Sequence, residues 1–145
     1  MACNNYEKAL ALAKQAHAGQ LDKAGQPYIN HLLAVADCFD DEITKTVGIL
    51  HDIVEDTDYT CDDLTKMGFS VKVVEAVGCL TKCCGEDYQD YLCRVGANNY
   101  AREVKIADLK HNMDLSRLDK VTEKDLKRVA KYKAALEYLQ NNRQV

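Results

Sequence analysis

Apolar residues recur every three or four positions along most of this chain, and no segment alternates strictly between apolar and polar residues as a half-buried strand would. This spacing predicts helices over residues 4–17, 28–39, 42–56, 71–82, 86–95, 98–116 and 122–141, with a short one near 61–67. No repeat, low-complexity tract or linker rich in Gly, Pro or Ser separates these segments. We therefore expect an all-α fold, a compact multi-helix bundle that forms a single domain over residues 1–145.

The composition is that of an ordinary globular protein, with 47% hydrophobic residues, 29% charged residues and a formal net charge of -4. No apolar run approaches the ~20 residues that a membrane span needs, and the first residues lack the regions of a secretory signal. The lysines are spread along the chain, whereas binding a nucleic acid polymer needs a clustered positive face. We expect a cytoplasmic protein whose partner is a small nucleotide, not a membrane or a nucleic acid polymer; the oligomeric state is not predicted.

The chain has seven cysteines. Because no secretory signal is evident and the number is odd, we interpret them as reduced thiols. Cys79, Cys83 and Cys84 cluster in the sequence but lack the paired Cys-x2-Cys spacing of a structural zinc site. We expect free thiols there and no second metal site.

The most informative segment lies within the helix predicted over residues 42–56. At about 100° per residue, its apolar residues occupy one arc and a histidine and three acids occupy the opposite one. The members of this polar arc are His51, Asp52, Glu55 and Asp56. The carboxylates repel one another unless water screens them or a cation joins them. For a bare His-Asp pair, a solvated acidic face is the simpler interpretation.

Two other segments favour a metal site. His31 lies near the start of a helix that Pro27 opens, and Asp108 shares a helix face with Lys105 and Asn112 through i+3 and i+4 spacing. The candidate ligands are thus two imidazole nitrogens and two carboxylate oxygens from three helices, namely His31, His51, Asp52 and Asp108. This mixed set suits one divalent ion such as Mn²⁺, Fe²⁺, Co²⁺ or Zn²⁺, and leaves room for water or substrate on a metal that prefers six ligands.

The order of these ligands is the H…HD…D signature, and the chain resembles the HD-domain metal-dependent phosphohydrolase superfamily. Within it, the chain is most similar to the RelA/SpoT-type (p)ppGpp hydrolase domain and its small stand-alone relatives. The residues that carry the resemblance lie in three stretches, 16–31, 50–57 and 104–113. The resemblance implies an all-α HD fold in which the four candidate ligands bind the metal, usually Mn²⁺ in this family.

The resemblance also implies roles for four further residues. Glu55 and Asp56 would orient the attacking water and handle protons. Asn112 matches a residue that contacts the nucleotide, and Lys23 matches part of a basic nucleotide-binding loop. Lys105 either supports a phosphate or only offsets the acidic cluster. The implied reaction is that of the stringent response, removal of the 3'-pyrophosphate from ppGpp or pppGpp with release of pyrophosphate and GDP or GTP.

Two departures from the family pattern fall on substrate recognition. Asp22-Lys23-Ala24 stands where the alarmone hydrolases typically carry Arg-Lys-Ser, and Asp114-Leu115 stands where they continue with Arg-Thr. A carboxylate beside a phosphate is unfavourable. The alternatives are hydrolysis of another nucleotide, such as NADPH or a nucleoside monophosphate, or a non-catalytic module that senses a nucleotide. The presence of both acids one turn beyond the His-Asp pair favours catalysis.

Three remaining features have simpler interpretations. His17 ends the first predicted helix and is better explained as a partner of the helix dipole, or a support of the site, than as a ligand. His111 either orients Asp108, contacts substrate or is structural. The helix over residues 122–141 carries an apolar stripe, so we assign it to packing and expect no chemistry from it.

Overall fold

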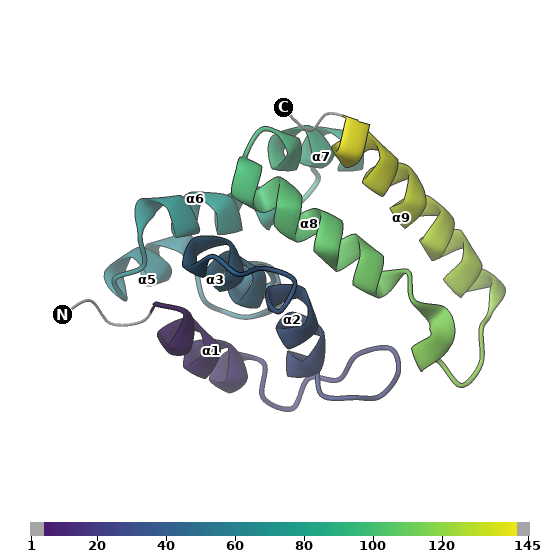
Figure 1. Ribbon diagram of the computed structural model, residues 1–145, viewed down its shortest axis with the longest axis horizontal. Coiled ribbons are helices and arrows are strands. Elements are labelled where there is room, and N and C mark those ends of the chain that lie inside the picture. The colour runs from purple at the N-terminus through teal and green to yellow at the C-terminus, as the bar shows by residue number, and fades with distance from the viewer. Residues whose placement is uncertain (1–4, 142–145) are drawn as a thin grey trace.

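The computed structural model describes residues 5–141 as helices joined by loops (Figure 1). The helices are α1 (Asn5–Ala16), α2 (Ile29–Ala36), α3 (Glu42–Leu50), α4 (Ile53–Asp56), α5 (Cys61–Lys66), α6 (Val71–Leu80), α7 (Tyr88–Gly96), α8 (Asn99–Asn112), a 3-10 helix (Leu115–Arg117) and α9 (Glu123–Asn141). Within residues 5–141, strand-type pairing is limited to an isolated bridge between Leu21 and Pro27, so the all-α prediction is confirmed. No helix in this range has both the length and the apolar character needed to cross a bilayer.

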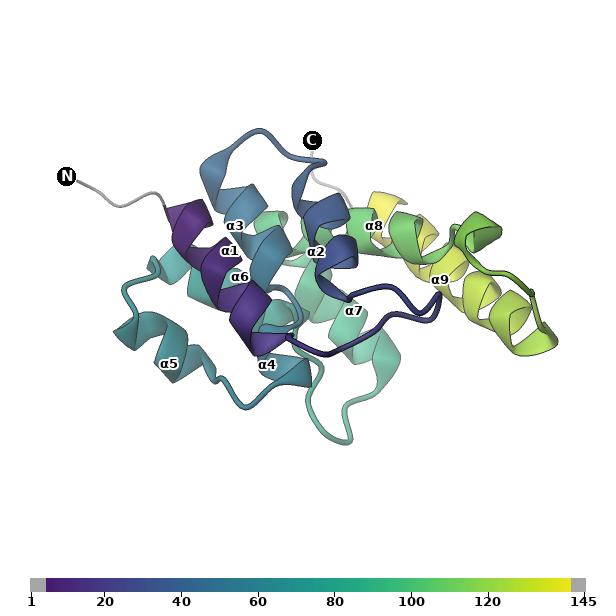
Figure 2. The same cartoon turned by 90° about the horizontal axis from the view of Figure 1, so that it is seen from below.

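Helices α3 and α8 form the centre of the bundle. α1, α2 and α6 pack on α3, whereas α2, α6, α7 and α9 pack on α8, and the two central helices contact each other (Figure 1, Figure 2). Residues 46–50 of α3 are all buried. Gly48 permits the close approach of α2, because a Cβ added there would lie 3.2 Å from the Cα of Ala36. The segments that carry the candidate ligands are therefore packed against one another at short range.

The predicted helix over residues 42–56 is interrupted at His51 and Asp52. α3 ends at Leu50 and α4 begins at Ile53, with φ −104° and ψ 0° at Asp52. The His51 ring explains the break, because its Nδ1 donates to the carbonyl of Gly48 at 2.6 Å. In a continuous helix that carbonyl would accept from the N–H of Asp52. The prediction of one continuous helix is wrong here, and the His51 side chain is buried in the bundle and not part of a solvated face.

The predicted helix over residues 98–116 also ends early. α8 stops at Asn112, and a separate 3-10 turn follows over Leu115–Arg117. Asp114 separates the two, because its backbone is extended and its Oδ1 accepts from the N–H of Ser116 at 3.0 Å. A side chain that caps a new turn competes with continuation of the helix. The chain is thereby turned back toward α9.

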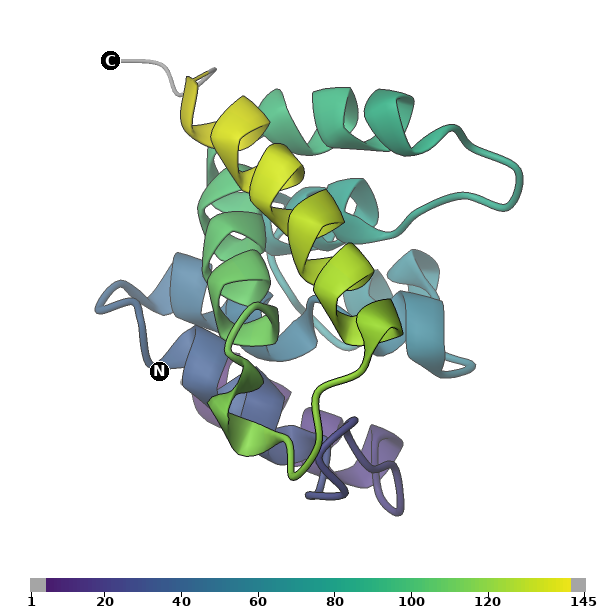
Figure 3. The ribbon, with the colours of Figure 1, turned by 90° about the vertical axis from the view of Figure 1, so that its right-hand side faces the viewer.

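Only the C-terminal half of α9 packs in the core. Its buried residues are Ala135 and Leu139, whereas Leu126 near its start is 56% exposed. Figure 3 shows the start of α9 on the same side of the molecule as the loop that follows α1. The N-terminal half of α9 is therefore available to line a cleft.

Candidate metal centre

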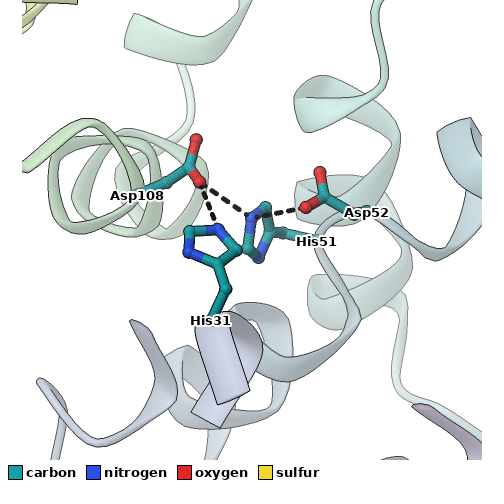
Figure 4. Close-up of side chains that lie close together, drawn as sticks. All are labelled: His31, His51, Asp52 and Asp108. Atoms are coloured by element: carbon teal, nitrogen blue, oxygen red, sulfur yellow. Dashed lines mark hydrogen bonds and ion pairs between the residues drawn. The ribbon is translucent and has the colours of Figure 1, made fainter. Parts of the chain in front are cut away.

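The four candidate ligands lie together between α2, α8 and the turn that joins α3 to α4. His31 comes from α2, His51 and Asp52 from that turn, and Asp108 from α8. One ligand atom from each residue lies within 4.8 Å of the others (Figure 4). Asp108 Oδ1 is 2.8 Å from His31 Nε2 and 3.3 Å from His51 Nε2, and Asp52 Oδ2 is 3.1 Å from His51 Nε2. The structure thus brings together all four residues selected from the sequence.

The tautomer of His51 indicates that a cation fits among these atoms. Its Nδ1 must carry a proton, because the Gly48 carbonyl that it contacts can only accept. In the neutral ring, Nε2 then directs a lone pair at the oxygens of Asp52 and Asp108, which is favourable when a positive charge lies among them, either a proton on Nε2 or a metal ion. Burial lowers the pKa of His51, but these two carboxylates outweigh burial and raise this pKa well above its usual 6.5. Two imidazoles and two carboxylates are also the donor set that divalent transition metals accept.

The remaining contacts of Asp108 hold it in the ionised state. Lys105 Nζ lies 3.1 Å from Oδ2, and Asn112 Nδ2 donates to Oδ1 at 3.0 Å. Burial raises the pKa of Asp108, but Lys105 and His51 outweigh it and hold the pKa well below its usual range. Lys105 thus pairs with the oxygen that faces away from the imidazoles and offsets the charge of the acidic cluster.

Two aromatic side chains contact the candidate ligands Asp52 and His31. The hydroxyl of Tyr28 donates to Asp52 Oδ2, and burial and the neighbouring carboxylates raise the pKa of Tyr28. His31 Nδ1 and His111 Nδ1 are 2.7 Å apart, so one ring donates to the other. Such outer contacts fix the orientation of metal ligands and tune their basicity. Neither Tyr28 nor this role of His111 was selected from the sequence.

The two predicted catalytic acids lie on α4, next to the cluster and open to solvent. Glu55 Oε1 accepts from the backbone N–H of Lys82 at 2.8 Å. Partial burial, Asp52 and Glu55 raise the pKa of Asp56 from 3.8 to about 6. His17 is buried near Asp56, and its Nδ1 contacts Gln20 Oε1 at 2.9 Å. Glu55 and Asp56 thus form the solvent side of the site.

A cavity of about 330 Å³ adjoins the ligands. It is lined by Leu21, Asp22, Lys23, Ala24, Tyr28, His31, Asn112, Asp114, Leu118, Arg128 and Tyr132. Partial burial and the nearby Arg128 lower the pKa of Lys23, whereas Asp125 opposes this shift, so charged side chains of the loop and of α9 lie close together here. Arg128 and Tyr132 lie four residues apart on one face of α9, a spacing that was visible in the sequence and was assigned to packing. The expectation that this helix contributes only packing therefore misses one wall of the cavity.

The departures from the family pattern have local structural roles. Asp22 Oδ1 accepts from the N–H groups of Ala24 and Gln26, each at 2.9 Å, so this carboxylate shapes the turn that presents Lys23. Asp114 caps the 3-10 turn in the same way.

The thiols of Cys79, Cys83 and Cys84 are free. Among the residues that the structure describes, they join no cluster of potential metal ligands.

The family model of the HD domain matches residues 9–90. Among curated proteins, the chain is 34% identical over 120 residues to "Probable GTP pyrophosphokinase" of Mycobacterium leprae, which covers 74% of this chain and 15% of that protein. It is 33% identical over 121 residues to "Bifunctional (p)ppGpp synthase/hydrolase SpoT" of Escherichia coli K12, covering 73% of this chain and 17% of that protein. The chain thus spans less than a fifth of the length of these relatives.

A solved structure has the same fold over nearly all of this chain. It is described as "A metazoan ortholog of SpoT hydrolyzes ppGpp and plays a role in starvation responses" and is 25% identical, with a TM-score of 0.74. The match covers 98% of this chain and 86% of the other. These similarities confirm the resemblance to the RelA/SpoT group that the sequence motifs indicated. With the HD-domain model matched over more than half of its residues, the chain belongs to the HD-domain family.

Proposed function

We propose that this chain is a metal-dependent phosphohydrolase that removes the 3'-pyrophosphate of ppGpp or pppGpp and releases pyrophosphate with GDP or GTP. The observation that carries the proposal is the convergence of the two imidazoles and two carboxylates within 4.8 Å, beside a cavity whose lining includes Lys23 and Arg128. The similarity to proteins whose names include ppGpp hydrolysis supports the choice of nucleotide. We further propose that residues 1–145 work as one catalytic domain.

His31, His51, Asp52 and Asp108 are the residues that would hold the divalent ion, for which we propose Mn²⁺. The chemistry that such an ion supplies is a lowered pKa of bound water and neutralisation of charge on a phosphoryl oxygen. Lys105 and Asn112 keep Asp108 ionised and in place. Tyr28 does the same for Asp52 through its hydroxyl.

Glu55 and Asp56 would position the attacking water and move its proton. In the protein without metal, partial burial and the neighbouring carboxylates raise the pKa of Asp56 to about 6, so this carboxylate is mostly ionised at neutral pH and is able to accept a proton from water. Glu55 is oriented by the Lys82 N–H, so only part of its hydrogen-bonding capacity is used. One carboxylate can thus orient water while its neighbour exchanges the proton.

The cavity walls would bind the nucleotide. Lys23 and Arg128 are suited to phosphate groups, because each places a cation at the cavity. The Tyr132 ring is a flat surface on which a base can stack. His31 and Asn112 line this cavity, so a nucleotide in it would lie next to the proposed metal ligands.

The test is to load the protein with Mn²⁺ and to measure the release of phosphate and pyrophosphate from a panel of nucleotides. The panel contains ppGpp, pppGpp, NADPH and nucleoside monophosphates. We expect pyrophosphate release from ppGpp and pppGpp, and none from the His51→Ala variant. Phosphate release from NADPH or a monophosphate alone would assign the site to another nucleotide. Binding of ppGpp without turnover of any member of the panel would favour a sensing module instead.

A further inference from the structure

Arg94 on α7 anchors the loop over residues 81–87, which joins α6 to α7 (Figure 3). Its Nε donates to Glu86 Oε2 at 3.0 Å and its Nη2 donates to Glu86 Oε1 at 2.8 Å, a two-pronged ion pair. The same guanidinium donates to the carbonyls of Gly78 at 3.0 Å and Thr81 at 2.9 Å. One side chain therefore ties both ends of this loop together.

Glu86 closes the loop from inside. Its Oε1 accepts from the N–H of Cys83 at 3.0 Å, and its own N–H donates to the Cys83 carbonyl at 3.0 Å. Hydrogen bonds from Arg94 and from the Cys83 backbone lower the pKa of Glu86 to about 2, so this carboxylate is ionised throughout the neutral range. Lys82 lies between two residues, Thr81 and Cys83, that are both held in this network.

The backbone of Lys82 is the point where this network meets the proposed active site. Its N–H donates to Glu55 Oε1 at 2.8 Å. Glu55 is exposed and stands on α4, a helix of four residues, so the helix itself restrains its side chain little. The Lys82 N–H is therefore a contact through which the loop can direct the Glu55 carboxylate.

We propose that Arg94 is a positioning residue that orients Glu55, and that it acts through the anchored loop and the backbone N–H of Lys82. This inference rests on the role proposed above for Glu55. It assigns a function in the reaction to a residue on α7, a helix that contributes no side chain to the metal ligands or to the cavity. Arg94 itself would touch neither substrate nor metal.

A double-mutant cycle separates this role from a structural one. We expect Arg94→Gln to lower kcat by about 10–100-fold with an unchanged KM, because misplacing a reacting group by about 1 Å costs up to about 10²-fold. In a Glu55→Gln background, the same change should alter kcat by less than about twofold, since Arg94 acts only through Glu55. An equal drop in both backgrounds would overturn the proposal.

A second measurement does not depend on activity. We expect amide hydrogen exchange at Lys82, followed by NMR, to become faster in Arg94→Gln and in Glu86→Gln, approaching the rate in Glu55→Ala, where the acceptor is gone. Exchange at Lys82 that stays as slow as in the unaltered protein would overturn the positioning role. If the unaltered protein hydrolyses no nucleotide, the proposed function fails and this measurement still decides the structural step.

Arg102→Gln is the matched control. Arg102 on α8 donates to the carbonyl of Gly96, at the other end of α7, at 3.2 Å. Like Arg94, it therefore holds the end of a helix, but it does not contact the loop over residues 81–87. We expect this variant to lower the melting temperature without changing exchange at Lys82 or kcat. If Arg94→Gln fails to fold, Glu86→Gln tests the same connection, because it removes the charge from the two-pronged pair alone.

Discussion

The proposed metal centre lies among packed helices, whereas the adjoining cavity is walled by a loop and the N-terminal half of α9. His31 and His51 are each 2% exposed, and Asp108 is 5% exposed. Each of these side chains is hydrogen-bonded to a neighbouring residue. On the cavity side, Leu21 is 65% exposed and Lys23 is also exposed. The ligands are thus constrained by the core, and the substrate walls are constrained mainly by local turns.

This difference separates the chemistry from the choice of substrate. A change at a buried ligand leaves unpaired charges in the core, which is costly. A change in a surface loop alters binding with little effect on the fold. The departures from the family pattern at Asp22 and Asp114 both fall in the cavity wall, and both side chains are used in turns. Under the proposed function, we therefore expect changes in the cavity wall to alter substrate preference without altering the proposed metal centre.

The sharpest test of this comparison is loss of a ligand. We expect His51→Ala to lower Mn²⁺ affinity by more than about 100-fold, because even outer contacts of metal ligands are worth about 10–100-fold. Electron paramagnetic resonance of free Mn²⁺ measures the affinity, and circular dichroism checks the fold. A folded variant with undiminished affinity would place the ion elsewhere.

A smaller effect is expected from an outer contact. Tyr28→Phe removes the hydroxyl that donates to Asp52 and keeps the ring, so we expect Mn²⁺ affinity to fall by about 10–100-fold. Competition with a fluorescent chelator measures the affinity. Tyr138→Phe is the control, because its hydroxyl contacts Cys93 and is remote from the ligands. Equal affinities of both variants would mean that the Tyr28 hydroxyl does not tune the centre.

The cavity wall should respond differently. Arg128→Ala removes a cation from the proposed phosphate-binding wall, and we expect KM for ppGpp to rise about tenfold, the equivalent of about 1.4 kcal/mol, with kcat nearly unchanged. Steady-state kinetics measures both constants. Lys133→Ala, an exposed cation of α9 outside the cavity, should change neither. A fall in kcat at constant KM would tie α9 to the chemical step.

The smallest expected effect concerns stability. The raised pKa of Asp56, about 6 in the folded protein against 3.8, means that its ionised form is disfavoured in the fold. The stability that it contributes is therefore present below pH 3.8 and is lost as the pH rises through about 6. In protein stripped of metal with EDTA, we expect Asp56→Asn to raise Tm at pH 7.5. The corresponding gain in the free energy of unfolding should be no more than about 1 kcal/mol, because solvent screens this site.

Thermal melts at pH 7.5 and at pH 3.5 measure this effect. The gain from Asp56→Asn should disappear at the lower pH, where the carboxyl of the unaltered protein is protonated in both states. A gain of the same size at both values would assign the effect to something other than charge. Glu55→Gln in the same buffers serves as a comparison for a neighbouring carboxylate of α4.

Sequence patterns were informative where the chemistry of the residues and their local spacing carried the signal. The His51-Asp52 pair alone fits a solvated acidic face, and it became a candidate metal site only together with His31 and Asp108. The helix break at His51 could not be predicted, because it arises when the ring takes the Gly48 carbonyl from the backbone. Helical periodicity gives the buried face of a segment and does not register such competition between a side chain and a helical hydrogen bond.

Residues that act across the bundle were not predicted. Arg128 and Tyr132 fit the pattern of a packing helix, and Arg94 fits that of a helix exposed to solvent. Their importance comes from what faces them: the loop carrying Lys23 in the first case, and Glu86 and the end of α6 in the second. Spacing along one helix does not specify which segment it meets.

By itself, the sequence determined the all-α class and the residue types able to bind a divalent ion, because helical periodicity and the chemistry of imidazole and carboxylate groups are local properties. Only the tertiary structure decided that four such groups meet at one point, that α9 walls the cavity and that Arg94 is linked to Glu55. These are contacts between segments distant in the chain, and they depend on how the helices pack around α3 and α8.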